Sequence, residues 1–201
     1  MKRACICMIF AFLLAGCIST SSSPNPRFYM LSSMDKDAVS QKFNMPADVI
    51  IEIGPVNIPE YLDRPQIVTQ DKNKMLIFAQ FDRWGESLDS ALVRLLAENL
   101  TLMLPGASLQ MFPCNFVIPL KYRVIIDVIQ MDSELDKDLF LVAQWSIIDL
   151  KNKKMALTKR FEFRQPIDPH TYAGLAKTLS IACGSLSNEM AQAVSEITAK
   201  K

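Results

Sequence analysis

The chain has 201 residues, half of them hydrophobic, with 22 Lys and Arg residues against 21 Asp and Glu residues. This length suits one domain with its own core, and the apolar content excludes a disordered chain. A net charge of +1 excludes strong attraction to nucleic acid, and one His with six Gly leaves little material for a metal cage or a phosphate loop.

The first residues have the pattern of a lipoprotein signal peptide. Lys2 and Arg3 precede thirteen uncharged residues, fewer than the roughly 20 that a membrane-spanning helix needs. The run ends in Leu-Ala-Gly before Cys17, which is the lipobox of bacterial lipoproteins. We therefore expect residues 1–16 to be removed and Cys17 to carry S-diacylglycerol and an N-acyl chain. The alternative is an ordinary cleaved signal with an incidental Cys.

The residues after the lipobox predict where the protein resides. Ile18 stands where an Asp commonly retains lipoproteins in the inner membrane, which favours the outer membrane, facing the periplasm. Residues 17–26 form a Ser- and Pro-rich tether that reaches roughly 30 Å when extended. Residues 27–201 then show no repeat and no break, so they are expected to form a single domain.

Loss of residues 1–16 changes the charge and the cysteine count. It removes two basic residues, so that 20 remain against 21 acids and the side-chain charge is −1. Only Cys114 and Cys183 remain free to pair. A disulfide in the oxidising periplasm and two separate thiols are both compatible with their spacing.

The first half of the domain predicts strands at 28–31 and 48–58, separated by a polar loop at 32–46. A hairpin is expected from strands 66–70 and 75–80 around the turn 71–74. Leucines at helical spacing then predict a helix from about Asp82 or Glu86 to Leu104, ended by Pro105 and Gly106.

The second half predicts strands at 108–112, 121–131, 139–149 and 155–164. Short polar connections indicate an antiparallel meander. Asp168 is the expected N-cap and Pro169 the first residue of a final helix over 169–198. The expected fold class is α+β, a single domain with a largely antiparallel sheet and two long amphipathic helices on one face.

The sequence lacks the motifs of an enzyme. His170 is the only His, and no nucleophile motif accompanies it. The alternating acids of 132–138 resemble half of a calcium loop, but Lys137 and Ala143 stand where Gly and Glu are needed, so a solvated hairpin tip is expected. We expect no catalytic activity, no metal and no cofactor.

A Pro-rich corner at 54–68 is the most distinctive stretch. Each Pro holds its predecessor extended, so this link is stiff and is either a structural corner or a contact surface. Trp84, just before the first helix, is expected to seal the core, and Arg83 to pair with Asp82 or Glu86. The candidates for partner contacts, or for the scaffold beneath them, are Tyr61, Leu62, Arg64, Arg83 and Trp84.

At these residues the chain resembles the ABC-type transport auxiliary lipoproteins, the family of paraquat-inducible protein C. The resemblance covers residues 28–198, which follow the lipobox in the sequence. The similar features are Gly-Pro-Val-x-Ile-Pro-Glu-Tyr-Leu-Asp-Arg-Pro-Gln-Ile-Val at 54–68, Arg83-Trp84 before Glu86-Ser87-Leu88, Asn99-Leu100 through Leu104-Pro105-Gly106, Trp145 in a central strand and Tyr172-x-x-Leu175 in the last helix. Residues 106–121 depart from the pattern.

The resemblance implies a non-enzymatic protein that accompanies an MCE-domain lipid transport system. Such a lipoprotein would dock the periplasmic end of the MCE protein and its ABC transporter at the outer membrane. The alternatives are a lipid-binding chaperone with an apolar cavity between sheet and helices, and a periplasmic enzyme. A homo-oligomer suits a docking role, although neither periodicity nor charge indicates one.

Overall fold

The computed structural model describes residues 24–200, which form two sheets and two long helices, α2 (Leu88–Met103) and α3 (Tyr172–Ala199). This confirms the α+β class. The expected signal peptide, Cys17 and most of the tether lie outside the described residues. Two short 3-10 turns, η2 (Lys36–Ala38) and η3 (Glu60–Leu62), lie in the connections.

The larger sheet has five strands. They are, in spatial order, β5 (Ser108–Met111), β2 (Ile50–Asn57), β6 (Tyr122–Ser133), β7 (Asp138–Asp149) and β8 (Lys154–Pro166). The predicted meander is confirmed for β6, β7 and β8. It does not include β5, which pairs in parallel with β2 on the far side of β6. Helix α2 lies in the chain between β2 and β5 and provides the crossover that parallel strands need.

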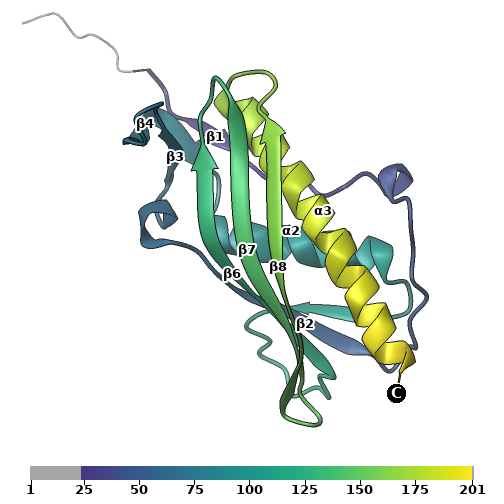
Figure 1. The fold of residues 1–201 in the computed structure, drawn as a ribbon. Coiled ribbons are helices and arrows are strands. Elements are labelled where there is room, and N and C mark those ends of the chain that lie inside the picture. Colours follow the sequence, from purple (N-terminus) through teal and green to yellow (C-terminus); the bar gives the residue numbers. More distant parts are fainter. Residues whose placement is uncertain (1–23, 201) are drawn as a thin grey trace, which may run out of the picture.

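The alternation predicted for β7 determines which face of the sheet the helices cover. Leu141, Trp145 and Ile147 are at most 3% exposed and belong to the core. Helix α3 runs along this face of β7 and β8, and α2 packs between α3 and β2 (Figure 1). The core therefore lies between one face of the sheet and the two helices, as expected.

Both helices begin later than the sequence predicted. Residues 82–84 belong to β4, so α2 begins at Leu88 with Ser87 as N-cap. In α3 the predicted Asp168 cap is wrong, because Thr171 is the N-cap and its side chain accepts a bond from Gly174 N at 3.1 Å. The chain folds back here, so that a Cβ on Gly174 would lie 1.8 Å from the Pro169 oxygen.

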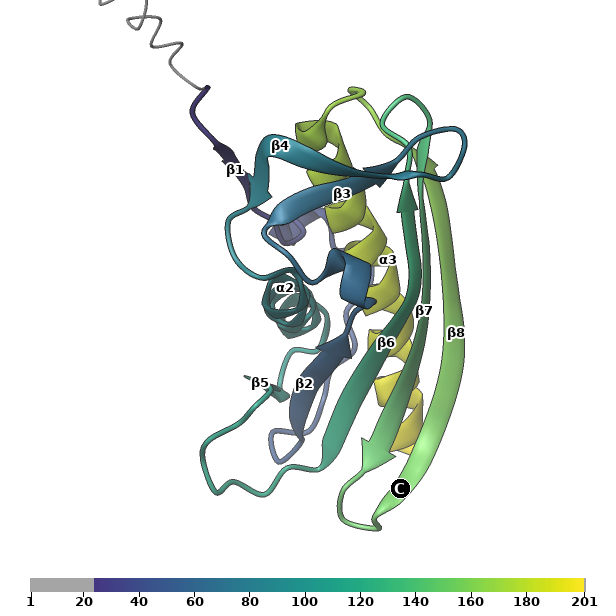
Figure 2. The ribbon, with the colours of Figure 1, turned by 90° about the vertical axis from the view of Figure 1, so that its left-hand side faces the viewer.

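A second, three-stranded sheet has the order β1 (Arg27–Tyr29), β4 (Leu76–Trp84), β3 (Gln66–Gln70). Strand β1 is parallel to β4, whereas β3 and β4 form the predicted hairpin. Asp71 accepts bonds from the amides of Asn73 (2.8 Å) and Met75 (2.9 Å) and closes its turn. This sheet lies at the upper end of the molecule, where the described chain begins (Figure 2).

The space between the larger sheet and the helices is almost completely filled. The cavity there has a volume of about 10 Å³ and is lined by apolar side chains such as Leu92, Ile126 and Leu186. This volume is about that of one water molecule. The layer is therefore a packed core.

Candidate functional site

The Pro-rich corner joins the two sheets, and two of the five candidate residues support it from within. Leu62, in η3, is 2% exposed and belongs to the core. The Tyr61 hydroxyl lies 3.3 Å from Met131 N and 3.5 Å from Met131 O, and partial burial raises the Tyr61 pKa. Both residues fix the corner against β6.

Trp84 also faces inward, at 5% exposure, and its backbone N–H donates to the Pro65 oxygen at 2.8 Å. Its neighbour Arg83 does not form the predicted ion pair. Asp82 instead binds Arg27, and Glu86 binds Arg94 at 2.6 Å. The prediction failed because successive strand residues point to opposite faces, so Asp82 and Arg83 cannot meet.

Asp82 is the centre of a polar cluster beneath the small sheet. Its carboxylate accepts two bonds from Arg27 and one from the Tyr29 hydroxyl, each at 2.7 Å. The Arg27 guanidinium therefore holds the pKa of Asp82 below its ordinary value. The Tyr29 ring lies 6.4 Å from that of Tyr172, at the start of α3. The cluster attaches β1 to β4 and brings the beginning of the described chain close to α3.

The opposite face of the small sheet carries the two candidate arginines. Phe28 and Gln66 both stand opposite Arg83 in the register, and Phe78 stands opposite Val68 across a register shift in the β3–β4 pairing. In β4 the residues Ala79, Asp82 and Trp84 are buried, whereas Phe78 is exposed and Arg83 half-buried, so both turn away from the buried face. Cross-strand partners share a face. The Arg64 guanidinium lies over the Phe78 ring, with its central carbon 4.3 Å from the ring centroid.

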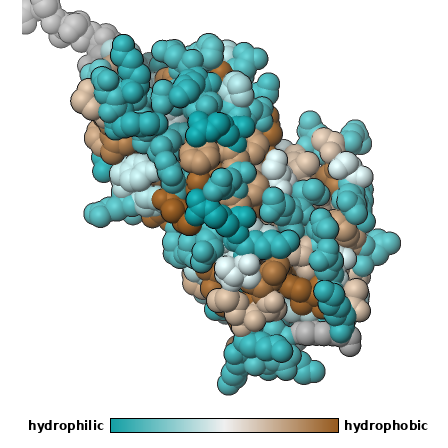
Figure 3. Space-filling view, in the orientation of Figure 1, coloured by the Kyte–Doolittle hydropathy of each residue, from teal (hydrophilic) through white to brown (hydrophobic). Residues whose placement is uncertain are grey.

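We call this face the Arg64–Arg83 surface. Its members are Phe28, Arg64, Leu76, Phe78 and Arg83. The phenylalanines are 62% and 46% exposed and Leu76 is 39% exposed, whereas the arginines are half-buried. Within residues 24–200 no carboxylate pairs with either arginine, and the Nε of each is buried without a hydrogen-bond partner. Figure 3 shows apolar side chains at this end of the molecule among hydrophilic ones.

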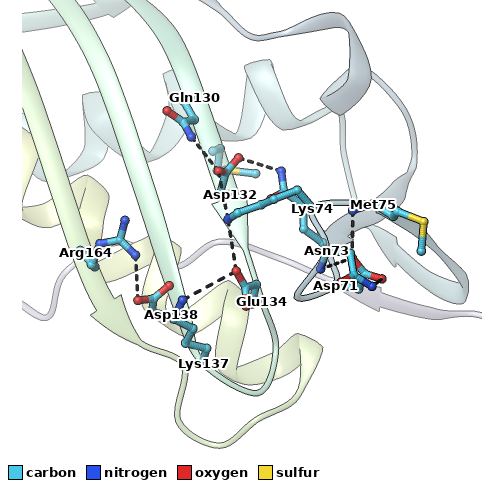
Figure 4. A network of polar contacts seen from close by, with 12 residues as sticks. Asp71, Asn73, Lys74, Met75, Gln130, Asp132, Glu134, Lys137, Asp138 and Arg164 are labelled. Atoms are coloured by element: carbon cyan, nitrogen blue, oxygen red, sulfur yellow. Dashed lines mark hydrogen bonds and ion pairs between the residues drawn. The ribbon is translucent and has the colours of Figure 1, made fainter.

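A polar network fixes the β3–β4 hairpin to the larger sheet (Figure 4). Lys74 Nζ lies 3.2 Å from Glu134 and 3.8 Å from Asp132, which also accepts a 2.8 Å bond from Gln70. Arg164 pairs with Asp138 at 2.9 Å. These acids face cations, and no metal-binding group of three His, Cys, Asp or Glu occurs in the described part of the chain. The predicted hairpin tip thus fastens the small sheet.

The two cysteines within residues 24–200, Cys114 and Cys183, are free thiols. Cys183 is 1% exposed, in the helix layer. The Cys114 N–H donates to Glu52 Oε1 at 3.0 Å, and Glu52 alternates with the core residues Ile51 and Ile53. Cys114 is therefore on the other side of β2 from the helices, and the sheet separates the two sulfurs.

Sequence reasoning missed the loop that joins β5 to β6. It lies at the opposite end of the molecule from the small sheet (Figure 2), and Phe116 and Val117 are 76% and 107% exposed. The signal in the sequence was a short apolar run between Pro113 and Pro119. Within a loop, such a run has no strand partner to cover it.

A larger groove, of about 700 Å³, lies between the segment 30–40 and the outer side of α3. Its lining combines Met30 and Met34 with polar residues such as Ser180 and Asn188. It is separate from the packed layer between sheet and helices. None of the helices described over residues 24–200 is both long and apolar enough to span a membrane.

The model of the family of ABC-type transport auxiliary lipoprotein components matches residues 29–191, so the chain belongs to that family. Its fold is similar to a crystal structure of an uncharacterized protein (17% identity, TM-score 0.69, covering 85% of this chain and 99% of that one). It is also similar to protein XCC0632 from Xanthomonas campestris (11% identity, TM-score 0.62, covering 87% of this chain and 98% of that one). These identities indicate a shared fold only. No curated protein matches the sequence.

Proposed function

We propose that this protein is a non-enzymatic, lipid-anchored adaptor that links an MCE-type ABC lipid transport system to the outer membrane. The observation that carries the proposal is membership of the transport auxiliary lipoprotein family. The family match covers residues 29–191 and is preceded by a complete lipobox that ends at Cys17. Residues 18–26 would be the tether, and 27–201 the domain that binds the transporter. The partner would be the MCE-domain protein and its ABC transporter.

The anchor is tested on the N-terminus of the mature protein. Mass spectrometry of the first tryptic peptide is expected to give Cys17 with three acyl chains, because several chains are needed for stable anchorage. Cys17→Ser is expected to abolish the acylation. Separation of inner and outer membranes should then place the acylated protein in the outer-membrane fraction. An unmodified N-terminus or an inner-membrane location would contradict this part of the proposal.

The partner is tested by affinity isolation of the full-length protein from detergent-solubilised envelopes. We expect an MCE-domain protein and its permease or ATPase to co-purify. A matched preparation of another outer-membrane lipoprotein controls for unspecific capture. Recovery of no transporter subunit would contradict the proposal.

A lipid-binding chaperone is the second candidate, and the cavity between sheet and helices disfavours it. That cavity, of about 10 Å³, is far smaller than an acyl chain. An enzymatic role has little support either. His170 is exposed, and its Nδ1 lies 2.9 Å from the Leu135 backbone oxygen. Native mass spectrometry that found a bound phospholipid would favour the chaperone.

A further inference from the structure

We propose that the Arg64–Arg83 surface lies against the anionic lipid headgroups of the membrane that holds the anchor, with Phe28, Leu76 and Phe78 entering the interface. This inference rests on the proposed anchorage at Cys17. It adds a second membrane contact, made by the folded domain itself, and an orientation of the domain on the bilayer.

The first argument is the distance between the anchor and the surface. Cys17 precedes Pro24, the first described residue, by seven residues, and these span at most about 25 Å. Phe28 follows Pro24 by only four residues and stands on this surface. An acylated Cys17 would therefore keep the surface close to the bilayer, whereas the exposed loop around Phe116 is at the opposite end (Figure 2).

The second argument is the chemistry of the side chains. Arg64 and Arg83 have no acidic partner within residues 24–200, so their charges are available to phosphate groups. A long arginine side chain can lie along apolar surface while its charge stays in the headgroup layer. Exposed Phe28 and Phe78 beside them provide apolar area for the acyl boundary. Basic and apolar residues on one face are typical of proteins that lie on a membrane.

The third argument is that the surface is held rigidly. The Arg27–Asp82 pair attaches β1 to β4, and Lys74 attaches the hairpin to Glu134, which directly follows β6. The surface is therefore preorganised, and contact with lipid orders few additional groups. Because the whole domain moves with it, this contact would point the β5–β6 loop away from the membrane.

The test uses the full-length, acylated protein in vesicles of phosphatidylethanolamine and phosphatidylglycerol with brominated acyl chains. Phe28→Trp and Leu76→Trp each add a tryptophan on the surface, and Phe116→Trp is the matched control at the opposite end. The native Trp84 and Trp145 are buried and provide the same background in all three variants. We expect bromine to reduce the added emission of Phe28→Trp and Leu76→Trp, and to leave that of Phe116→Trp unchanged.

A charge variant tests the arginines separately. In Arg64→Gln/Arg83→Gln combined with Phe28→Trp, the quenching is expected to fall. Replacement of phosphatidylglycerol by phosphatidylcholine should reduce the quenching of Phe28→Trp, and should change that of the charge variant less. Circular dichroism verifies that each variant is folded.

Two failures are distinguishable. Protein that is not acylated and does not stay with the vesicles contradicts the proposed function. Protein that is acylated and stays, but shows equal quenching at positions 28, 76 and 116, overturns this inference alone. The inference is also overturned if position 28 is unquenched and Phe28→Glu abolishes co-purification of the transporter, since the surface would then bind protein.

Discussion

Both oxygens of the Asp82 carboxylate accept a bond from the Arg27 guanidinium, Oδ1 from Nε and Oδ2 from Nη2, each at 2.7 Å. The pair joins the first described strand to the last residues of β4, next to Trp84. Arg27 is largely exposed, whereas the Asp82 side chain is 5% exposed. One buried carboxylate thus connects the beginning of the described chain with the small sheet and the core.

This pair predicts a loss of stability in acid. Because Arg27 lowers the pKa of Asp82 below its ordinary value of 3.8, the unfolded chain binds a proton more readily than the folded one. The stabilisation is therefore complete above pH 3.8 and is lost as the pH falls below it. Asp82→Asn should flatten this part of the curve of unfolding free energy against pH. Asp63→Asn, at an exposed position of the corner, is the control for the removal of one carboxylate.

A second prediction concerns Asn99, which is 0% exposed in α2. Its Oδ1 accepts a 2.9 Å bond from Met34 N, and its Nδ2 lies 3.4 Å from Ser187 Oγ in α3. Asn99→Ala leaves the Met34 amide unpaired and is expected to cost about 2 kcal/mol in a urea unfolding titration. Ser187→Ala removes the longer bond to Asn99 and the 2.8 Å bond that the Ser187 hydroxyl donates to the Cys183 oxygen. It leaves no backbone amide unpaired, because that oxygen lies in the middle of α3, and should therefore cost less. An equal cost for the two variants would contradict this interpretation.

A third prediction separates the cysteines by reactivity. Burial raises the pKa of Cys183 to about 12, so its thiol should be unreactive towards a maleimide at pH 7.5, whereas the half-buried Cys114 should react. We expect one label in the native protein, two in guanidinium chloride, and none in native Cys114→Ser. Labels that appear only after a reductant is added would instead indicate a disulfide.

A fourth prediction concerns the end of α2. Gly106 has φ +98°, and a Cβ there would lie 2.1 Å from the Met45 oxygen. Gly106→Ala is therefore expected to destabilise the protein by about 2 kcal/mol or more. Gly85→Ala is the matched control, because its Cβ would approach closely only the flexible, 54% exposed Met30 side chain and would lie at an ordinary 3.4 Å from the Tyr29 oxygen. Thermal unfolding of the two variants should show a larger decrease in Tm for Gly106→Ala.

Periodicity in the sequence was sufficient to predict most helices and strands. The leucines of α2 and the alternation of β7 around Trp145 each repeat over at least ten residues, so one misplaced residue does not hide the pattern. Helix starts were less predictable. Asp168-Pro169 has the composition of a helix start, but Thr171 caps α3 because the chain folds back over the first turn.

The candidate contact residues were separated by the structure into two groups. Tyr61, Leu62 and Trp84 turn inward and support the corner, whereas Arg64 and Arg83 share an exposed face with Phe28 and Phe78. The sequence could not predict this division, since Phe28 lies 55 residues from Arg83 and meets it only through the parallel pairing of β1 with β4.

Local sequence patterns of a few to about twenty residues were enough to predict the α+β class, most strands and helices, the lipobox and the family resemblance. The number of sheets, the pairing of β5 with β2, the pairing of Arg27 rather than Arg83 with Asp82, and the placement of the two thiols on opposite sides of β2 became known from the three-dimensional contacts. These features depend on contacts between distant segments. The alternation of residues in a strand predicts which side chains share a face. It does not predict which distant residues will cover that face.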